Sequence, residues 1–343
     1  MGYGVFDFYA KEDENKRQEA RKLWDNFQRE VINKISFYEL PVMTLDGDTS
    51  REAVCKIFEN VNTGGIVLTV FELLTASYAM QIDLLTGIGF NLRKDWERLK
   101  PEVTGTRDGD ISDIFENINE TTFLTTVTLY TNYLKKQNGR IKYIACKKKD
   151  VLNLDFDSYI NNRDDVAHGF KLARDFLIRY IYVFKKSDLP YEGQVVPLAA
   201  ICALLGESGV NRNINILTRW YWCGVLGEMY GGASETRYAN DVEDIMMAIE
   251  SSDVSKIRTI NSAFFSATRL LELQRRTSAV YKGILALFYK NGCRDFAIDT
   301  PLDIMYYTNA DLDIHHIFPK RYCESRLTLN QVGATQLLIK HRY

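Results

Sequence analysis

The sequence predicts a mainly α-helical protein of several domains. The chain has 343 residues, and at roughly 100 to 200 residues per domain this length suggests two or three domains. Only six prolines interrupt it, and apolar residues recur at the three- and four-residue spacing of a helix over most of its length. Apolar residues make up 46% and charged residues 26% of the chain, which excludes disordered and collagen-like proteins.

The first elements expected are three helices. The first is amphipathic, and its apolar face carries Trp24, Phe27, Val31 and Ile35. A second helix covers residues 50–61, and a sharp turn at residues 62–65 follows it. The third begins at Thr69, because Glu72 three residues later completes a capping box that binds free backbone N–H groups.

The middle of the chain is predicted to be a helical bundle. Residues 86–112 and 135–162 are rich in Gly, Asn and charge and are expected to form loops or small excursions. The last helix of the bundle ends at Asn291-Gly292, a C-cap signal. Short β-prone runs follow, including Leu312–Pro319, so we expect a domain boundary near residue 292. The helices expected are 121–136, 164–185, 194–206, 213–230, 236–250, 256–273 and 277–290.

Composition and charge predict a cytoplasmic protein. The net charge of −2 gives no bulk attraction to nucleic acid, so any contact with DNA needs a local basic patch. Six scattered cysteines form no C-x-x-C pair and indicate no disulfide framework. The first residues lack a signal peptide, and the apolar run Val195–Leu205 is too short to span a bilayer. We therefore expect a chain that is neither secreted nor membrane-spanning.

The adjacent histidines His315 and His316 are the strongest chemical signal. Neighbouring residues on a strand point to opposite faces, so one imidazole can bind a metal while the other takes a proton from water. A metal and a general base together are suited to hydrolysing a phosphodiester. The alternative is that the pair ends a buried strand with its hydrogen bonds satisfied.

The segment Asp313-Ile-His-His-Ile-Phe-Pro-Lys320 resembles the first half of the His-Asn-His (ββα-metal) motif in DUF1524 nuclease domains. This resemblance implies that His315 binds a divalent ion, magnesium or manganese, and that His316 is the general base. Asp313 would orient a ring. The second half of the motif supplies a further catalytic residue and a further metal ligand. Asn330 could take the place of that catalytic residue, and His341 the place of that ligand. A structural zinc site formed by His315, His316 and Cys323 is a further alternative, but it lacks a fourth ligand.

The segment from Ile57 to Leu73 resembles the F-x-x-[IVL]-N-x-G-G-x-x-L-[ST]-x-x-E-L block of DUF262 domains, whose fold is ParB/sulfiredoxin-like. By this resemblance Asn62, Gly64 and Gly65 occupy cofactor-binding positions. The alternative is a helix, a glycine turn and a capped helix without a site. No segment matches the D-G-Q-Q-R-type motif that handles the nucleotide in this family, so hydrolysis of a nucleoside triphosphate is not expected. The resemblance implies a chain truncated at both ends.

A third block, residues 189–237, is similar to the helical region that joins the two domain types. The whole order resembles GmrSD-like type IV restriction enzymes. It implies a remnant of an α/β domain at 1–85, a helical region at 86–292 and a partial nuclease domain at 293–343. The expected function is that of an endonuclease in a phage-defence restriction system. Its partner would be DNA, including modified phage DNA, and the chain could form a homo-oligomer. The alternative is an inactive helical scaffold that binds DNA or a partner.

Three further features have both functional and structural interpretations. Seven cations between Lys135 and Lys149 could neutralise phosphates or form a solvated loop balanced by nearby acids. An aromatic set could stack on bases, although side chains at helical spacing usually belong to a core. His168, within a helical stretch, is expected to be structural or exposed. The aromatic set is Trp220, Trp222 and Tyr230.

Overall fold

The chain forms two compact units, residues 1–50 and 51–343, in a computed structural model. The domain boundaries expected near residues 85 and 292 fall inside the second unit and stay predictions. The structure describes residues 14–39, 42, 44, 49, 53–54, 57, 68–79, 81–82, 87, 89–105, 114–232, 234–273, 275–295, 298–303, 307, 312–315 and 338–341.

The first unit contains the expected amphipathic helix. It runs through α2 (Glu14–Phe27), a π-helical turn (Gln28–Ile32) and α3 (Asn33–Ser36). Its apolar face is solvent-exposed at Leu23, Phe27, Val31 and Ile35.

The second unit begins with the expected capping box. The side chain of Thr69 caps α5 (Val70–Tyr78) by accepting from the Glu72 N–H at 3.2 Å, while the Thr69 N–H donates to Glu72 Oε2 at 2.7 Å. The box therefore confirms where this helix starts. Most of the expected helix at 50–61, and the glycine turn at 62–65, lie outside the described residues.

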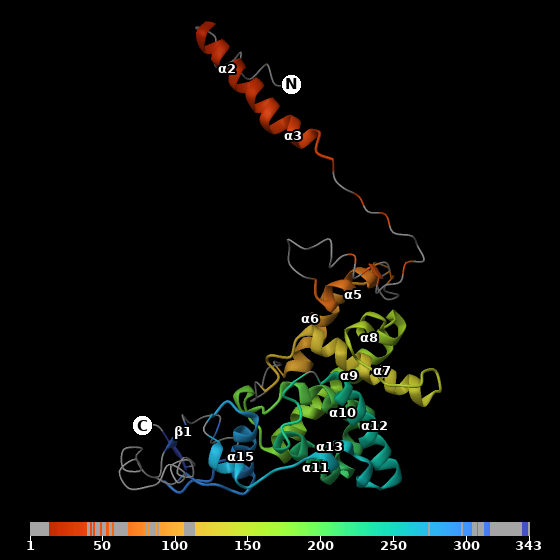
Figure 1. Cartoon of the computed structure of the whole chain (residues 1–343), viewed down its shortest axis with the longest axis vertical. Helices are drawn as coiled ribbons and strands as arrows, with labels where there is room; N and C mark the ends of the chain where they lie inside the picture. The colour runs from red at the N-terminus through yellow and green to blue at the C-terminus, as the bar shows by residue number, and fades with distance from the viewer. Residues whose placement is uncertain are drawn as a thin grey trace. The chain divides into compact units, whose positions relative to one another are not determined.

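The rest of the second unit is a helical body (Figure 1), so the prediction of a mainly helical fold is confirmed. Two helices, α9 and α10, run through its core. The first contacts α6, α7 and α10, and the second also contacts α7 and α12. The helices are α6 (Leu92–Thr104), α7 (Glu120–Gln137), α8 (Lys148–Leu152), α9 (Phe156–Phe176), α10 (Val195–Arg212), α11 (Ile214–Leu226), α12 (Glu235–Ser251), α13 (Arg258–Ser262), α14 (Arg269–Glu272) and α15 (Ala279–Lys290). Shorter turns are a π-helical turn (Leu177–Ile181) and 3₁₀ turns at Lys186–Asp188, Glu192–Gln194 and Val254–Lys256.

Three local predictions are wrong. The segment 86–112 contains helix α6, because Leu92, Trp96, Leu99 and Val103 bury one face despite the Gly, Asn and charge around them. The segment 135–162 contains α8 and the start of α9, which Asp155 caps through the Ser158 N–H. The single helix expected at 256–273 is two short helices, α13 and α14, because residues 263–266 leave the helical conformation.

Helix α10 is the apolar centre of the body. The apolar run Val195–Leu205 is short, but the helical segment that contains it, Glu192–Arg212, is long and apolar enough to cross a membrane by length and composition. Of its most apolar stretch, 61% is buried inside the protein, as in the core helix of a soluble protein. Gly206, with φ 62° and ψ 175°, also breaks the helical geometry.

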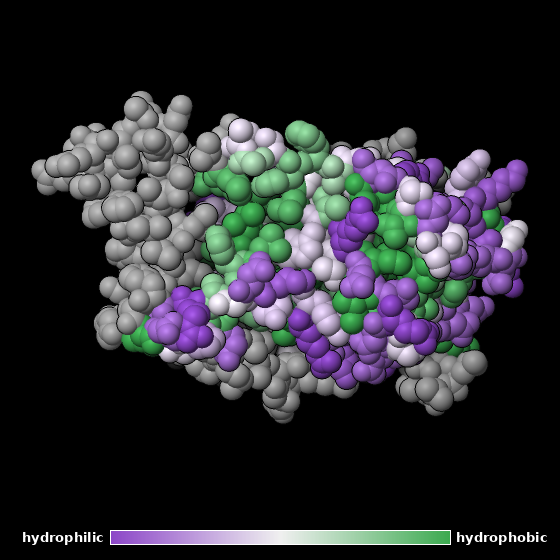
Figure 2. All heavy atoms as spheres, turned by 90° about the horizontal axis from the view of Figure 1, so that it is seen from below, coloured by the Kyte–Doolittle hydropathy of each residue, from purple (hydrophilic) through white to green (hydrophobic). Residues whose placement is uncertain are grey.

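The surface of the body mixes apolar and polar groups. Phe264, Leu270 and Phe288 are exposed. Figure 2 shows one face of the molecule, where hydrophobic side chains gather in patches between hydrophilic ones.

In the described part of the C-terminal region, two strands form an antiparallel sheet. Helix α15 stops at Asn291, and Gly292 adopts φ 71°, which confirms the predicted C-cap. Strand β1 (Leu312–His315) lies within the predicted β-prone run and pairs with β2 (Leu338–His341). The register opposes Leu312 to His341, Asp313 to Lys340, Ile314 to Ile339 and His315 to Leu338.

The packing of α9 on α10 yields a first prediction. A Cβ atom added at Gly169 of α9 would lie 2.5 Å from the carbonyl oxygen of Ala199 and 2.7 Å from Cβ of Ala203, both on α10. Alanine normally favours a helix over glycine by about 1 kcal/mol, but overpacking costs about 1 to 3 kcal/mol. We expect Gly169→Ala to lower the free energy of unfolding, measured by urea denaturation.

The matched control is Gly231→Ala, because a Cβ there meets no atom within 4 Å. Its free energy of unfolding should stay within about 0.5 kcal/mol of the wild type. A stabilised Gly169→Ala variant would contradict the close approach of the two helices.

Candidate functional site

The predicted nuclease residues are only partly within the described structure. Asp313 and His315 lie in β1, and His341 lies in β2, so the strands that carry them are hydrogen-bonded neighbours. The roles proposed for these three residues remain predictions. The remaining candidates, His316, Asn330, Cys323, Asn62, Gly64 and Gly65, lie outside the described residues.

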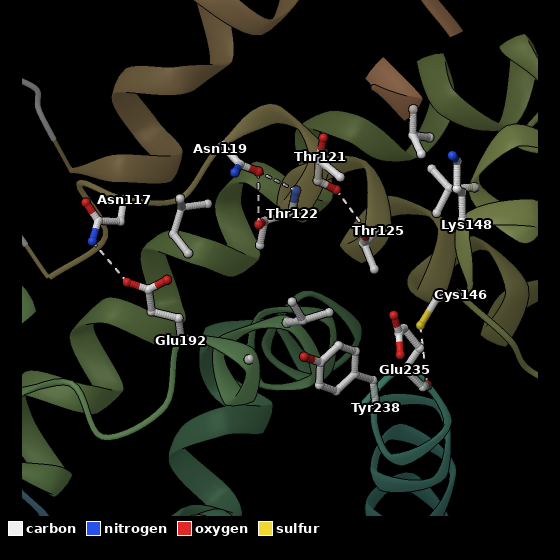
Figure 3. A pocket seen from close by; sticks show the side chains of 15 residues that line it. Asn117, Asn119, Thr121, Thr122, Thr125, Cys146, Lys148, Glu192, Glu235 and Tyr238 are labelled. Atoms are coloured by element: carbon white, nitrogen blue, oxygen red, sulfur yellow. Dashed lines mark hydrogen bonds between the residues drawn. The ribbon is translucent and has the colours of Figure 1, made fainter. Parts of the chain in front are cut away.

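A polar pocket of about 390 Å³ lies in the helical body (Figure 3). It forms where several helices begin: the first turns of α5, α7, α8 and α12 line it, together with the 3₁₀ turn at Glu192–Gln194 that leads into α10. Its volume lies within the range of about 300 to 1,000 Å³ that small-ligand sites occupy. The polar lining residues are Asn117, Asn119, Thr121, Thr122, Thr125, Cys146, Lys148, Glu192, Glu235 and Tyr238.

Helix α7 and its N-cap residue supply the threonine hydroxyls and one amide group of the pocket. Oδ1 of Asn119 caps this helix by accepting from the Thr122 N–H at 2.9 Å and from its hydroxyl at 3.1 Å. One turn later, the hydroxyl of Thr125 donates to the carbonyl oxygen of Thr121 at 2.8 Å. These local bonds satisfy the helix start and fix the polar groups at the pocket wall.

Glu192 and Glu235 lie on opposite sides of the pocket, with Tyr238 between them in the view of Figure 3. Both lie in the first turn of a helical segment, where the helix dipole favours negative charge. The side-chain amide of Asn117 donates to Oε1 of Glu192 at 3.0 Å. The pocket is therefore rich in hydrogen-bond acceptors.

Tyr238 forms the floor of the pocket in the view of Figure 3. Its hydroxyl oxygen lies 2.5 Å from the position that a Cβ atom would take at Gly193, so a side chain at that residue would displace it. Burial raises the pKa of Tyr238 above its usual value. Its hydroxyl is consequently neutral at pH 7 and can both donate and accept a hydrogen bond.

The Cys146 thiol lines the pocket but is a poor nucleophile. Burial, with smaller effects from Glu235 and Asp150, raises its pKa to about 12. Its Sγ lies 3.5 Å from the carbonyl oxygen of Glu235 and donates to it. Because only a thiolate attacks readily, the pocket is suited to binding rather than to thiol chemistry. Within the described residues, no group of three His, Cys, Asp or Glu side chains could hold a metal ion.

The seven cations between Lys135 and Lys149 divide into two groups. Lys135 binds Asp155, with Nζ to Oδ2 at 2.7 Å, and Lys136 binds Glu243. The ring of Tyr143 is 81% exposed among the others. The other five cations are all exposed, and together with Tyr143 we call them the basic segment. The five are Arg140, Lys142, Lys147, Lys148 and Lys149.

The structural interpretation of the aromatic residues is confirmed for two of them. Trp220 is fully buried, and Tyr230 is buried with its hydroxyl donating to Asp241, so neither can stack on a base. Trp222 is partly buried against the same core. The side chain of His168 is 51% exposed, with Nδ1 3.6 Å from Glu102, as expected for a structural or exposed histidine.

Comparison with known proteins reveals a similarity to a longer archaeal protein. The chain is 25% identical over 332 residues to the uncharacterized protein MJ0686 of Methanocaldococcus jannaschii, a match that covers 90% of this chain and 52% of that protein. The chain thus spans about half the length of the relative it matches. No family model matches the chain.

The ion pair of Lys135 yields a second prediction. Although burial opposes ionisation, hydrogen bonds from Lys135 and Ser158 lower the pKa of Asp155 to about 2. A carboxylate with a lowered pKa stabilises the fold above its unfolded pKa of about 4, and this stabilisation disappears as the pH falls towards 2. We expect Asp155→Asn to reduce the free energy of unfolding at pH 7 by about 0.5 to 1 kcal/mol through the lost ion pair with Lys135, because asparagine caps a helix about as well as aspartate does.

Denaturation with urea at pH 7, 5, 4 and 3 measures this difference. The difference in the free energy of unfolding between the wild type and Asp155→Asn should shrink between pH 4 and pH 3. Asp157→Asn, in the exposed first turn of the same helix, is the matched control and should have a smaller effect. Equal losses for the two variants at every pH would contradict the assignment.

Proposed function

We propose that this chain is a DNA endonuclease of a modification-dependent restriction system, acting by metal-assisted phosphodiester hydrolysis. One observation carries the proposal: the segment from Leu312 to His315, which begins the motif resembling the His-Asn-His nucleases, forms a strand paired with the strand that ends at His341. Two paired antiparallel strands are the framework that a ββα-metal motif requires. That the substrate is DNA and that the protein acts in the cytoplasm are proposed from the resemblances to DUF262 and DUF1524.

The residue types of the proposed site suit a divalent ion, but the register of the two strands separates two of them. Imidazole and carboxylate groups are ordinary ligands of magnesium, manganese and zinc, and the paired strands carry His315, His341 and Asp313. By the resemblance His315 would hold the ion, which when bound would supply Lewis-acid stabilisation of the charge on the phosphate and the leaving oxygen. His341 opposes Leu312, three positions along β1 from His315, and this odd offset places the two histidines on opposite faces of the sheet, so His341 is not placed to share that ion.

The protein residues have separable roles in this mechanism. His316 takes a proton from the attacking water as the new O–P bond forms and the bond to the leaving oxygen breaks. Asp313 accepts a hydrogen bond from an imidazole and so fixes the orientation of that ring. No nucleotide step is included, because the chain contains no match to the family's nucleotide motif.

A helical scaffold that binds DNA or a partner is the second candidate. The observation that favours it is the polar pocket with the adjoining basic segment, because both lie in the helical body and need no residue of the β1–β2 sheet. A scaffold of this kind would bind without cutting.

Single histidine substitutions give the third prediction. We expect His316→Ala to abolish cleavage of modified DNA while leaving manganese affinity within about threefold of the wild type, because a general base is not a ligand. His315→Ala should weaken manganese binding by about tenfold or more, measured by calorimetry.

His168→Ala is the matched control, since this histidine lies in α9 and its side chain is half exposed. It should change neither cleavage nor metal affinity. If the wild-type chain cuts no modified or unmodified DNA with magnesium or manganese, the nuclease proposal fails and the scaffold replaces it.

A further inference from the structure

We propose that a nucleic-acid strand lies along the basic segment and that one of its bases enters the polar pocket. The inference rests on the proposed function only in taking DNA as the partner. It assigns the contact to the helical body, at the connection between α7 and α9, and not to the β1–β2 sheet.

The basic segment has the composition of a strand-binding surface. Five exposed cations lie within ten residues, and the exposed ring of Tyr143 lies among them in the sequence. Lysine and arginine neutralise phosphates without reading sequence. An exposed aromatic ring stacks on any base. In a chain with a net charge of −2, this local concentration of positive charge favours a polyanion here.

The segment and the pocket are continuous. Cys146 and Lys148 lie within residues 140–149 and also line the pocket. A nucleic-acid strand held by the lysines would therefore lie at the mouth of the pocket. One of its bases could enter the pocket by unstacking from its neighbours. Bases inside a duplex are stacked, so the occupant is an extruded or single-stranded nucleotide.

The pocket is suited to a base rather than to a phosphate. Glu192 and Glu235 on its two sides repel an anion but accept hydrogen bonds from the exocyclic amino groups of adenine, cytosine and guanine. The amide of Asn119 and the hydroxyls of Thr125 and Tyr238 add groups that donate and accept. Thymine has no amino group and offers only its N3–H as a donor, so the two carboxylates should bind it less tightly than the other bases.

Binding without metal provides the test. The full-length chain is titrated with labelled dC12 and dT12 single strands in the presence of a chelator, so that no cleavage contributes. We expect the wild type to bind dC12 about tenfold more tightly than dT12. The double variant Glu192→Gln, Glu235→Gln should lose most of this preference, because an amide can also donate to thymine O4. Glu120→Gln, a first-turn acid of α7 outside the pocket lining, is the matched control and should retain the preference.

The salt dependence of binding tests the lysines. Replacing Lys147, Lys148 and Lys149 with alanine should flatten the slope of log affinity against log salt by about two units for a single strand. The matched triple variant of exposed cations in α2, with alanine at Lys16, Arg21 and Lys22, should leave the slope unchanged.

Equal wild-type affinity for dC12 and dT12, or no binding to either, overturns the inference, and this measurement needs no variant to fold. A preference that survives in the double glutamine variant overturns the role of the pocket. The outcomes separate the two proposals. If the chain binds with base selectivity but never cuts DNA, this inference stands and the nuclease proposal fails. If it cuts DNA but shows no base selectivity, the nuclease proposal stands and this inference fails.

Discussion

The crossing of α9 over α10 at Gly169 sets the positions of the other parts of the helical body. Because this residue has no side chain, the backbone of α9 approaches Ala199 and Ala203 of α10 directly. Helix α9 is also anchored at its start by Asp155, which binds Lys135 near the end of α7. One close contact and one ion pair thus fix three helices relative to one another, and two of them, α7 and α10, contribute walls of the pocket.

The fold could be predicted where the signals are local. The capping box of Thr69 and Glu72, the limits of α7 and α12 to within two residues, and the cap at Asn291-Gly292 are all encoded within a few neighbouring positions. Helix α6 was missed because Pro101 and the glycines around it outweigh its apolar spacing. The pocket could not be predicted, since its walls come from first turns far apart in the sequence and only the packing of the helices brings them together. For the predicted nuclease site, the β-prone run at residues 312–319 correctly predicted strand β1. No local signal predicted that β2 would pair with it.

The polar groups inside the body mostly serve the body itself. Asp241 is buried and accepts from Tyr230 and Thr259, while Asp244 binds the guanidinium of Arg258 at 2.8 Å. These contacts tie α12 to α13 and to the turn that follows α11. Lys135 and Lys136 are likewise held in ion pairs, with Asp155 and Glu243, while the five cations of the basic segment are exposed and one of them, Lys148, lines the pocket. A nearly neutral protein can therefore present a strongly cationic surface at one point.

The protonated state of Cys146 has a consequence for the durability of the pocket. With a pKa of about 12, the Cys146 thiol is almost entirely protonated at pH 7. Peroxide and disulfide exchange act on the thiolate, and Cys202, buried in α10, has a raised pKa for the same reason of burial. Both thiols are therefore poor targets for oxidation, and the side of the pocket that Cys146 lines should keep its shape under oxidising conditions.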